Sequence, residues 1–240
     1  MIFSEKVTTR IEDFGKGGYM NPYSLLEIFE NAGNRHSEAV NDSAIDGSIN
    51  GISWIMTGWY AEIIKTPTYK DVLTVDTWIT AKTGTVRSER NFLLKNKNGE
   101  IIAKGQTQLS LLDVASGKII RIPENLCDVY GALKEGAFDK KLPRLSAADS
   151  KDSLSEIKIR RTDIDFNGHI HNISYIYLAF EALEGDFLES ENIKSSQIAY
   201  KKPLKYGDKA FVGKTCDENS CTVQISSETD VCCIIRMTID

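Results

Sequence analysis

The sequence has no long uninterrupted run of apolar residues. No segment approaches the roughly 20 residues that a helix needs to cross a bilayer. The opening residues, MIFSEKVTTRIEDFG, also lack the apolar core of a signal peptide. We therefore expect no membrane span and a cytoplasmic location.

The sequence also lacks an excess of positive charge and any cysteines in CxxC spacing. The 29 Lys and Arg residues are outnumbered by 34 Asp and Glu, for a formal net charge of -5. A nucleic-acid-binding surface needs a clustered excess of Lys and Arg, so we expect no nucleic-acid partner. The five cysteines are odd in number and lack CxxC spacing. A reducing compartment is their simplest setting, and we expect them to be buried apolar residues and not nucleophiles.

What remains is the composition of a folded protein, with 41% hydrophobic and 26% charged residues in a chain of 240. A helix is predicted over residues 21–40, where Asn21 is placed to cap it and Pro22 takes its first position. His36 falls on the apolar spacing of this helix, as a packed histidine would. Runs rich in Val, Ile, Thr, Trp and Tyr follow over residues 53–114 and indicate an antiparallel meander.

The order of helix and meander then occurs a second time. Residues 172–188, NISYIYLAFEALEGDFL, are apolar nearly all round a helix, which must therefore be covered by protein. Four strand-like segments follow them. PTYKDVLTV in the first half and PLKYGDKAFV in the second begin at equivalent places, which indicates a repeat.

The repeat predicts an α+β fold of two related domains, residues 1–125 and 153–240. The linker, residues 126–152, is rich in charge, Gly, Ala and Ser. In each domain an antiparallel sheet would wrap around a long central helix and hide its apolar surface. This arrangement is a tandem, or double, hotdog fold.

The segment DIDFNGHIHN, at 163–172, carries polar side chains at alternate positions. These positions are Asp163, Asp165, Asn167, His169 and His171. In an extended chain they would share one face, either a solvated strand face or an active site. Asp, Asn and Gly are poor strand formers, which weighs against the solvated strand. A metal site at Asp165, His169 and His171 is a weaker alternative, because no second ligand cluster accompanies it.

Three segments resemble one known family in both order and spacing. PTYKDVLTVDTW resembles its segment of Pro, Thr, an aromatic residue, Gly-Asp and a strand ending in Thr-Trp. SERNFLLKNKNGEIIAKGQTQLSLLDVASGKIIRIPENL is similar in its strand-turn-strand spacing. RRTDIDFNGHIHNISYIYLAFEAL resembles the signature Asp-x-Asp-x-Asn-x-His-Val-Asn-Asn-x-x-Tyr. The family is that of the acyl-acyl carrier protein (ACP) thioesterases, and the resemblance is to the bacterial type.

The resemblance implies a tandem hotdog that hydrolyses fatty acyl-ACP to free fatty acid and ACP, without a cofactor or metal. It places the family's proposed catalytic residues on Asp165, Asn167 and His169. Supporting roles fall on Asp163, Gly168, His171, Asn172 and Tyr175, and Glu181 matches a Glu near the end of the family's helix. Two departures stand out. His171 replaces the usual Asn, and Pro203 and Leu204 stand where some members carry a catalytic Glu or Cys.

The chemistry of thioester hydrolysis suits these residue types. Asp165 or His169 could take a proton from water, and the sequence leaves open which one does. Asn167 could orient the water or the thioester. A helix that begins near Asn172 would present unpaired N-H groups to the developing oxyanion.

The acyl chain and the carrier need sites of their own. By the resemblance, the acyl slot lies in the first domain, and its candidate lining residues are Trp54, Met56 and Trp59. Basic residues would attract the acidic carrier; the candidates are Lys158, Arg160, Arg161, Lys201, Lys202 and Lys205. An acyl-CoA thioesterase and a non-catalytic acyl-binding hotdog protein remain alternatives, and the sequence leaves a homodimer open.

Overall fold

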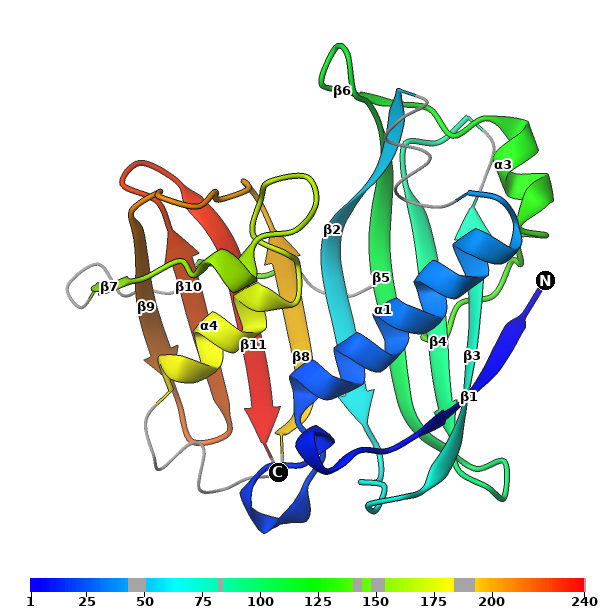
Figure 1. The fold of residues 1–240 in the computed structure, drawn as a ribbon, viewed down its shortest axis with the longest axis horizontal. Coiled ribbons are helices and arrows are strands. Elements are labelled where there is room, and N and C mark those ends of the chain that lie inside the picture. The colour runs from blue at the N-terminus through cyan, green and yellow to red at the C-terminus, as the bar shows by residue number, and fades with distance from the viewer. Residues whose placement is uncertain (43–50, 82–83, 140–143, 148–153, 184–192, 240) are drawn as a thin grey trace.

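The computed structural model describes residues 1–42, 51–81, 84–139, 144–147, 154–183 and 193–239. They form an 11-stranded sheet with α1 and α4 lying across one face (Figure 1). The helices are α1 (Pro22–Ala39), α3 (Glu124–Val129) and α4 (Ser174–Glu181), with 3-10 turns η1 (Ile11–Asp13), η2 (Lys16–Gly18) and η3 (Arg161–Asp163). The strands of the first half are β1 (Phe3–Thr8), β2 (Ile52–Ile63), β3 (Val72–Ala81), β4 (Ser88–Lys95), β5 (Ile101–Asp113) and β6 (Lys118–Ile120). Those of the second are β7 (Ser155–Ile157), β8 (Ile193–Tyr200), β9 (Ala210–Cys216), β10 (Ser220–Ser226) and β11 (Val231–Ile239).

In the first half, α1 packs on an antiparallel sheet of order β1-β3-β4-β5-β2. The helix begins at Pro22 as predicted, because the fixed φ of proline suits the first helical position. Its buried face includes Leu25, Leu26, Phe29, Ala32 and His36, so His36 is the packed histidine that its spacing predicts. The ring of Phe29 lies directly over Gly105, where a Cβ would come within 2.6 Å of it. Glycine in β5 thus lets the helix sit close to the sheet.

The second half repeats this layout with a shorter helix. Its sheet has the order β8-β11-β10-β9-β7. The helix α4 has eight residues and follows a cap at Ile173, so it begins slightly later than the predicted start near Asn172. Tyr175, Ile176 and Ala179 are among its buried residues. The predicted continuation beyond residue 183 lies outside the described residues.

The two halves are joined edge to edge through β2 and β8. These strands pair antiparallel from Gly58 opposite Ala199 to Glu62 opposite Ser195. A Cβ on Gly58 would stand 2.8 Å from the carbonyl oxygen of Ile198, so glycine permits this close approach. The α+β arrangement of two sheets, each covered by a helix, matches the prediction. The domain limits at residues 125 and 153 stay a prediction, and α3 occupies the start of the predicted linker.

Two further predictions concern cysteines and membrane spans. Cys232 and Cys233 are buried as expected, but Cys127 is half-buried, and the exposed Cys216 forms an unexpected disulfide with Cys221 between β9 and β10. The disulfide forms because the two residues lie directly opposite each other across the paired strands.

Within the described ranges, no helix is long and apolar enough to span a membrane.

Candidate active site

The segment 163–172 is a compact loop and not an extended strand. The turn η3 leads into it, and an isolated bridge between Ile164 and Ile170 closes it. Gly168 has a φ of 76°, a conformation that favours glycine. The polar residues therefore do not share one face, since Asp163 is buried whereas Asn167 is exposed.

Asp165 organises the centre of this loop. Its Oδ1 accepts hydrogen bonds from the backbone N-H of Asn167 at 2.8 Å and of His169 at 3.2 Å. Such bonds from an aspartate to the backbone that follows it stabilise a turn in place of a strand. The same carboxylate lines both of the cavities described below.

Asp163 fixes the start of the loop through hydrogen bonds with Arg160. Its buried carboxylate accepts the backbone N-H of Arg160 at 2.7 Å and the Arg160 guanidinium at 2.8 Å. The first half contains the same device, in which Asp13 accepts the backbone N-H of Arg10 at 2.6 Å and its guanidinium at 3.2 Å. Asp163 thus holds the start of the loop in place and lines neither cavity, and its supporting role in catalysis stays a prediction.

We expect Asp163→Ala and Asp13→Ala each to lower the free energy of unfolding by about 1–3 kcal/mol, because each removes charge-assisted bonds from a buried acceptor. Only Asp163→Ala should also reduce hydrolysis measured well below the melting temperature. Urea unfolding and an activity assay on both variants check this. Equal losses of activity in the two variants would contradict a local role of Asp163.

Residues 10–32 and 160–182 in fact align without a gap, and their loops share one backbone design. The N-H of Asn21 bonds the carbonyl of Asp13 at 2.8 Å, and the N-H of His171 bonds that of Asp163 at 2.8 Å. Gly18 and Gly168 have φ values of 78° and 76°. At the three central positions, the first loop has Gly15, Gly17 and Tyr19 where the second has Asp165, Asn167 and His169. The first loop thus forms an equivalent bridged turn with glycine at two of these positions, whereas in the second loop Asp165 also bonds the turn through its side chain.

Two cavities meet at this loop. The inner cavity, of about 170 Å³, extends below α1 in the first half. The outer cavity, of about 580 Å³, extends to the start of the loop after β8, at Lys201 and Lys202. Their shared wall consists of Ser53, Trp54, Met56, Asp165, Asn167 and Asn172. A bond to be cleaved at this wall would have one substituent in each cavity.

The two histidines of the loop line different cavities. His169 lines the outer cavity, as does Tyr175, whose hydroxyl accepts the backbone N-H of Leu204 at 3.1 Å. His171 lines the inner cavity, and its Nε2 lies 3.2 Å from the Oε2 of Glu30 on α1. This contact raises the pKa of the His171 imidazole, against the opposing effect of burial. The His171 side chain thus contacts the first half of the chain, while its carbonyl accepts the N-H of Ser174 at the start of α4 at 2.9 Å.

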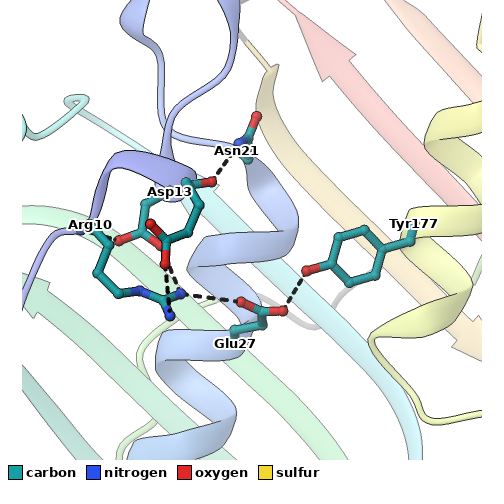
Figure 2. A network of polar contacts seen from close by, with 6 residues as sticks. Arg10, Asp13, Asn21, Glu27 and Tyr177 are labelled. Atoms are coloured by element: carbon teal, nitrogen blue, oxygen red, sulfur yellow. Dashed lines mark hydrogen bonds and ion pairs between the residues drawn. The ribbon is translucent and has the colours of Figure 1, made fainter. Parts of the chain in front are cut away.

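A second carboxylate of α1 also reaches the other half of the protein. The hydroxyl of Tyr177 on α4 donates a hydrogen bond to Glu27 at 2.5 Å, and Figure 2 shows Glu27 between Tyr177 and Arg10. Arg10 contacts Glu27 at 3.8 Å and Asp13 at 3.2 Å. Glu27 and Glu30 are three residues apart and so lie on neighbouring positions of one helix face. Of the two, only Glu30 lines a cavity.

The predicted acyl-pocket residues all line the inner cavity. Trp54, Met56 and Trp59 belong to β2, and Phe92 and Leu109 extend the same wall. Trp59 is 2% exposed and its ring lies 5.3 Å from that of Phe92. These residues give part of the cavity the apolar surface that a hydrocarbon chain needs.

Sequence reasoning missed a buried polar cluster at the inner cavity. Arg90 of β4 bonds the Nδ1 of His36 at 3.1 Å and the hydroxyl of Ser37 at 2.9 Å. Asp42 accepts bonds from Trp54 at 2.8 Å and from the hydroxyl of Tyr130 at 2.7 Å. Burial, reinforced by Arg90, lowers the pKa of His36 to about 4, so the imidazole is neutral. Only Arg90, Ser37, Asp42 and Trp54 line the cavity itself.

The basic candidates are spread over the second half. Lys201 and Lys202 line the outer cavity, and Lys202 also pairs with Asp230 at 2.6 Å. Arg160 is held by Asp163, and Arg161 lies 4.5 Å from the ring of Tyr206. Lys158 and Lys205 are exposed and line neither cavity.

The position where some family members carry a fourth catalytic residue, Glu or Cys, has no ionisable side chain in this protein. Pro203 lines the outer cavity without an ionisable group, and Leu204 is 1% exposed, with its carbonyl accepting the N-H of Ile170 at 2.8 Å. Glu181 is exposed on α4 and lines neither cavity. Among the described residues, no group of three or more His, Cys, Asp or Glu side chains is arranged to hold a metal ion.

The fold and the site together define a class of protein: a double hotdog whose two halves meet at a polar loop between two cavities. Residues 1–130 match the family model of the acyl-ACP thioesterase N-terminal domain, and residues 146–235 match that of the C-terminal domain. The chain belongs to the acyl-ACP thioesterase family.

Individual relatives are distant in sequence but similar in structure. Oleoyl-acyl carrier protein thioesterase 1, chloroplastic, from Arabidopsis thaliana is 20% identical over 87% of this chain and 62% of its own. The chain thus spans less than two thirds of that relative. An acyl-ACP thioesterase from Bacteroides thetaiotaomicron has a TM-score of 0.88 at 17% identity, covering 100% of this chain and 98% of its own. The 12:0-ACP thioesterase from Umbellularia californica has a TM-score of 0.87 at 20% identity, covering 100% and 97%. These likenesses confirm the tandem hotdog fold.

Proposed function

We propose that the protein hydrolyses fatty acyl-ACP to a free fatty acid and ACP, in the cytoplasm and without a cofactor. One observation carries the proposal. Asp165, Asn167 and His169 replace Gly, Gly and Tyr in a loop whose first copy makes an equivalent turn with other side chains, and Asp165 and Asn167 lie where two cavities meet. A set of polar side chains placed in a cleft is what a catalytic site needs.

The two cavities suit the two parts of a thioester. The acyl chain would enter the inner cavity against Met56, Trp59 and Phe92, where each buried methylene contributes about 0.8 kcal/mol. The thiol part would occupy the outer cavity and leave it near Lys201. The thioester carbonyl then stands at the shared wall, beside Asp165 and Asn167.

Hydrolysis adds water to the carbonyl carbon and breaks the carbon-sulfur bond. Asp165 or His169 takes a proton from the attacking water, and that proton goes to the departing thiolate. Asn167 orients the water or the thioester. The first turn of α4, which follows Asn172, directs its positive end toward the oxyanion that forms. The products are a carboxylic acid and a free thiol.

ACP is acidic, so the basic residues near the outer cavity would steer it. We expect the double variant Lys201→Glu and Lys202→Glu to lower kcat/KM for acyl-ACP about tenfold at low salt, with a smaller effect at high salt. Hydrolysis of the matching neutral N-acetylcysteamine thioester should be unchanged. Lys209→Glu, which changes an exposed lysine paired with Glu228, is the control. An equal loss on both substrates would contradict carrier docking at this surface.

A panel of acyl-ACPs of varied chain length, with matched acyl-CoAs, tests the function itself through thiol release. Turnover of acyl-ACP well above that of acyl-CoA supports the proposal. A strong preference for acyl-CoA would favour an acyl-CoA thioesterase. Acyl binding without thiol release from any substrate would favour a non-catalytic hotdog protein. A homodimer is compatible with the site but is not needed for it, because one chain supplies both halves.

A further inference from the structure

His171 occupies a position where the acyl-ACP thioesterase family usually has asparagine. In this structure its side chain contacts a carboxylate from the other half of the chain. Its Nε2 lies 3.2 Å from the Oε2 of Glu30, whose side chain is 16% exposed. Both residues line the inner cavity together with Asp165 and Asn167. A histidine oriented by a carboxylate beside a candidate reaction centre has the arrangement of an acid-base pair.

The geometry determines which ring nitrogen can serve a ligand. Because Nε2 faces Glu30, Nδ1 is the nitrogen left for a group in the cavity. The charged groups that face His171 are Glu30 and Glu27 of α1 and Asp165 of its own loop. All three are carboxylates, so the surroundings favour a protonated ring whose Nδ1 is a donor. Tyr200 lies close to Glu30, and burial raises the pKa of its phenol, so it adds no charge there.

We infer that His171 is an additional catalytic residue of the proposed hydrolysis, donating an Nδ1 hydrogen bond to the thioester carbonyl oxygen, and that Glu30 is its positioning residue. The inference rests on the proposed function. As water adds to the carbonyl carbon, the electron pair of the C=O bond moves to oxygen, which His171 stabilises. Collapse of the intermediate restores the C=O bond and expels the thiolate, which takes the proton removed from water.

This role gives His171 a task distinct from that of His169. His169 lines only the outer cavity, on the thiol side, and His171 only the inner cavity, on the acyl side. A protonated donor also predicts a specific pH dependence. Activity should fall as pH rises through the pKa of His171, because the neutral ring offers Nδ1 only as an acceptor. Since the contact with Glu30 raises that pKa, the fall should depend on Glu30.

Four variants test the inference on the acyl-ACP substrate that turns over fastest. We expect His171→Asn and His171→Ala to lower kcat about 100-fold with little change in KM, and to abolish the decline of kcat at high pH. Glu30→Gln should move that decline to lower pH, because it removes the contact that raises the pKa of His171. Glu27→Gln is the matched control, since it removes a carboxylate of the same helix that bonds Tyr177 of α4 and lines neither of the two cavities. Because Glu27 acts on the His171 ring without a hydrogen bond to it, this change should move the pH profile less than Glu30→Gln does.

Imidazole NMR provides a readout independent of turnover, because the chain has only three histidines. The His171 signal is identified by its loss in His171→Asn, and its pKa should fall in Glu30→Gln. The inference is overturned if that pKa falls while the kcat profile stays in place, since the pair would then be structural. It is also overturned if Glu27→Gln moves the kcat profile as far as Glu30→Gln does. Absence of thiol release by the wild-type protein would overturn the proposed function itself, a result distinct from either.

Discussion

Replacing Asp165 with asparagine should lower kcat for acyl-ACP hydrolysis by at least about 100-fold while leaving the free energy of unfolding nearly unchanged. Asparagine keeps an Oδ1 that can accept the backbone N-H groups of Asn167 and His169, so the loop retains its shape. It removes the negative charge and the capacity to take a proton. Steady-state kinetics and thermal melting on the same preparation measure both effects.

Asp165→Ala separates the two roles of this carboxylate. It removes the loop bonds as well as the charge and should destabilise the protein by about 1–2 kcal/mol in addition. Turnover of Asp165→Asn close to that of the wild-type protein would show that Asp165 only shapes the loop. His169 would then be the remaining candidate base of the pair.

The first copy of the loop supplies a matched control for His169. Tyr19 occupies the equivalent position, is exposed, and lines neither cavity. His169→Ala should therefore impair hydrolysis, whereas Tyr19→Ala should not. The backbone contexts are equivalent, because Tyr19 precedes Met20 of one isolated bridge and His169 precedes Ile170 of the corresponding bridge in the second half.

The sequence was most informative where local signals determine structure. Pro22 marked the start of α1 correctly, and runs rich in Val, Ile, Thr, Trp and Tyr indicated strands over residues 53–114, where β2 to β5 lie. The short apolar segment around Ile176 indicated a covered helix, and α4 is one. These features depend on residues close together in the chain, which is why composition and periodicity reveal them.

The shape of the loop was harder to predict for a physical reason. Alternation suggested an extended chain, but the side chain of Asp165 bonds to the backbone beyond it and closes a turn. The gap-free alignment of residues 10–32 with 160–182 carried the signal that would have corrected this. The first copy, with Gly15, Gly17 and Gly18, is plainly a turn.

Contacts between the halves could not be read from the sequence at all. Glu30 contacts His171, and Glu27 contacts Tyr177, although the members of each pair are far apart in the sequence. The pairing of β2 with β8 joins the two halves that carry them. The buried Arg90 is a similar case, because its strand shows no sign that one arginine turns inward to meet His36. Only the tertiary structure reveals such contacts. The proposed role of His171 at the inner cavity depends on one of them, its contact with Glu30.

Trp59→Ala should have the largest effect on stability, a loss of about 3–5 kcal/mol, because it empties a core site beside the stacked rings of Phe29 and Phe92. That is a large share of the roughly 5–15 kcal/mol that stabilises a typical domain. The same change enlarges the inner cavity, which Trp59 lines. We therefore expect the preferred acyl chain to lengthen, with about a fourfold gain in kcat/KM for each additional methylene that is buried.

Trp78 allows the two effects to be separated. It is 6% exposed, donates its indole N-H to the carbonyl of Glu135 at 2.8 Å, and lines neither cavity. Trp78→Ala should cost a similar amount of stability and leave the chain-length profile unchanged. Trp59→Phe, which keeps most of the packing, provides a folded variant if Trp59→Ala is too unstable to assay. An unaltered profile in both Trp59 variants would mean that the acyl chain does not reach this wall, and the acyl slot would have to be sought elsewhere.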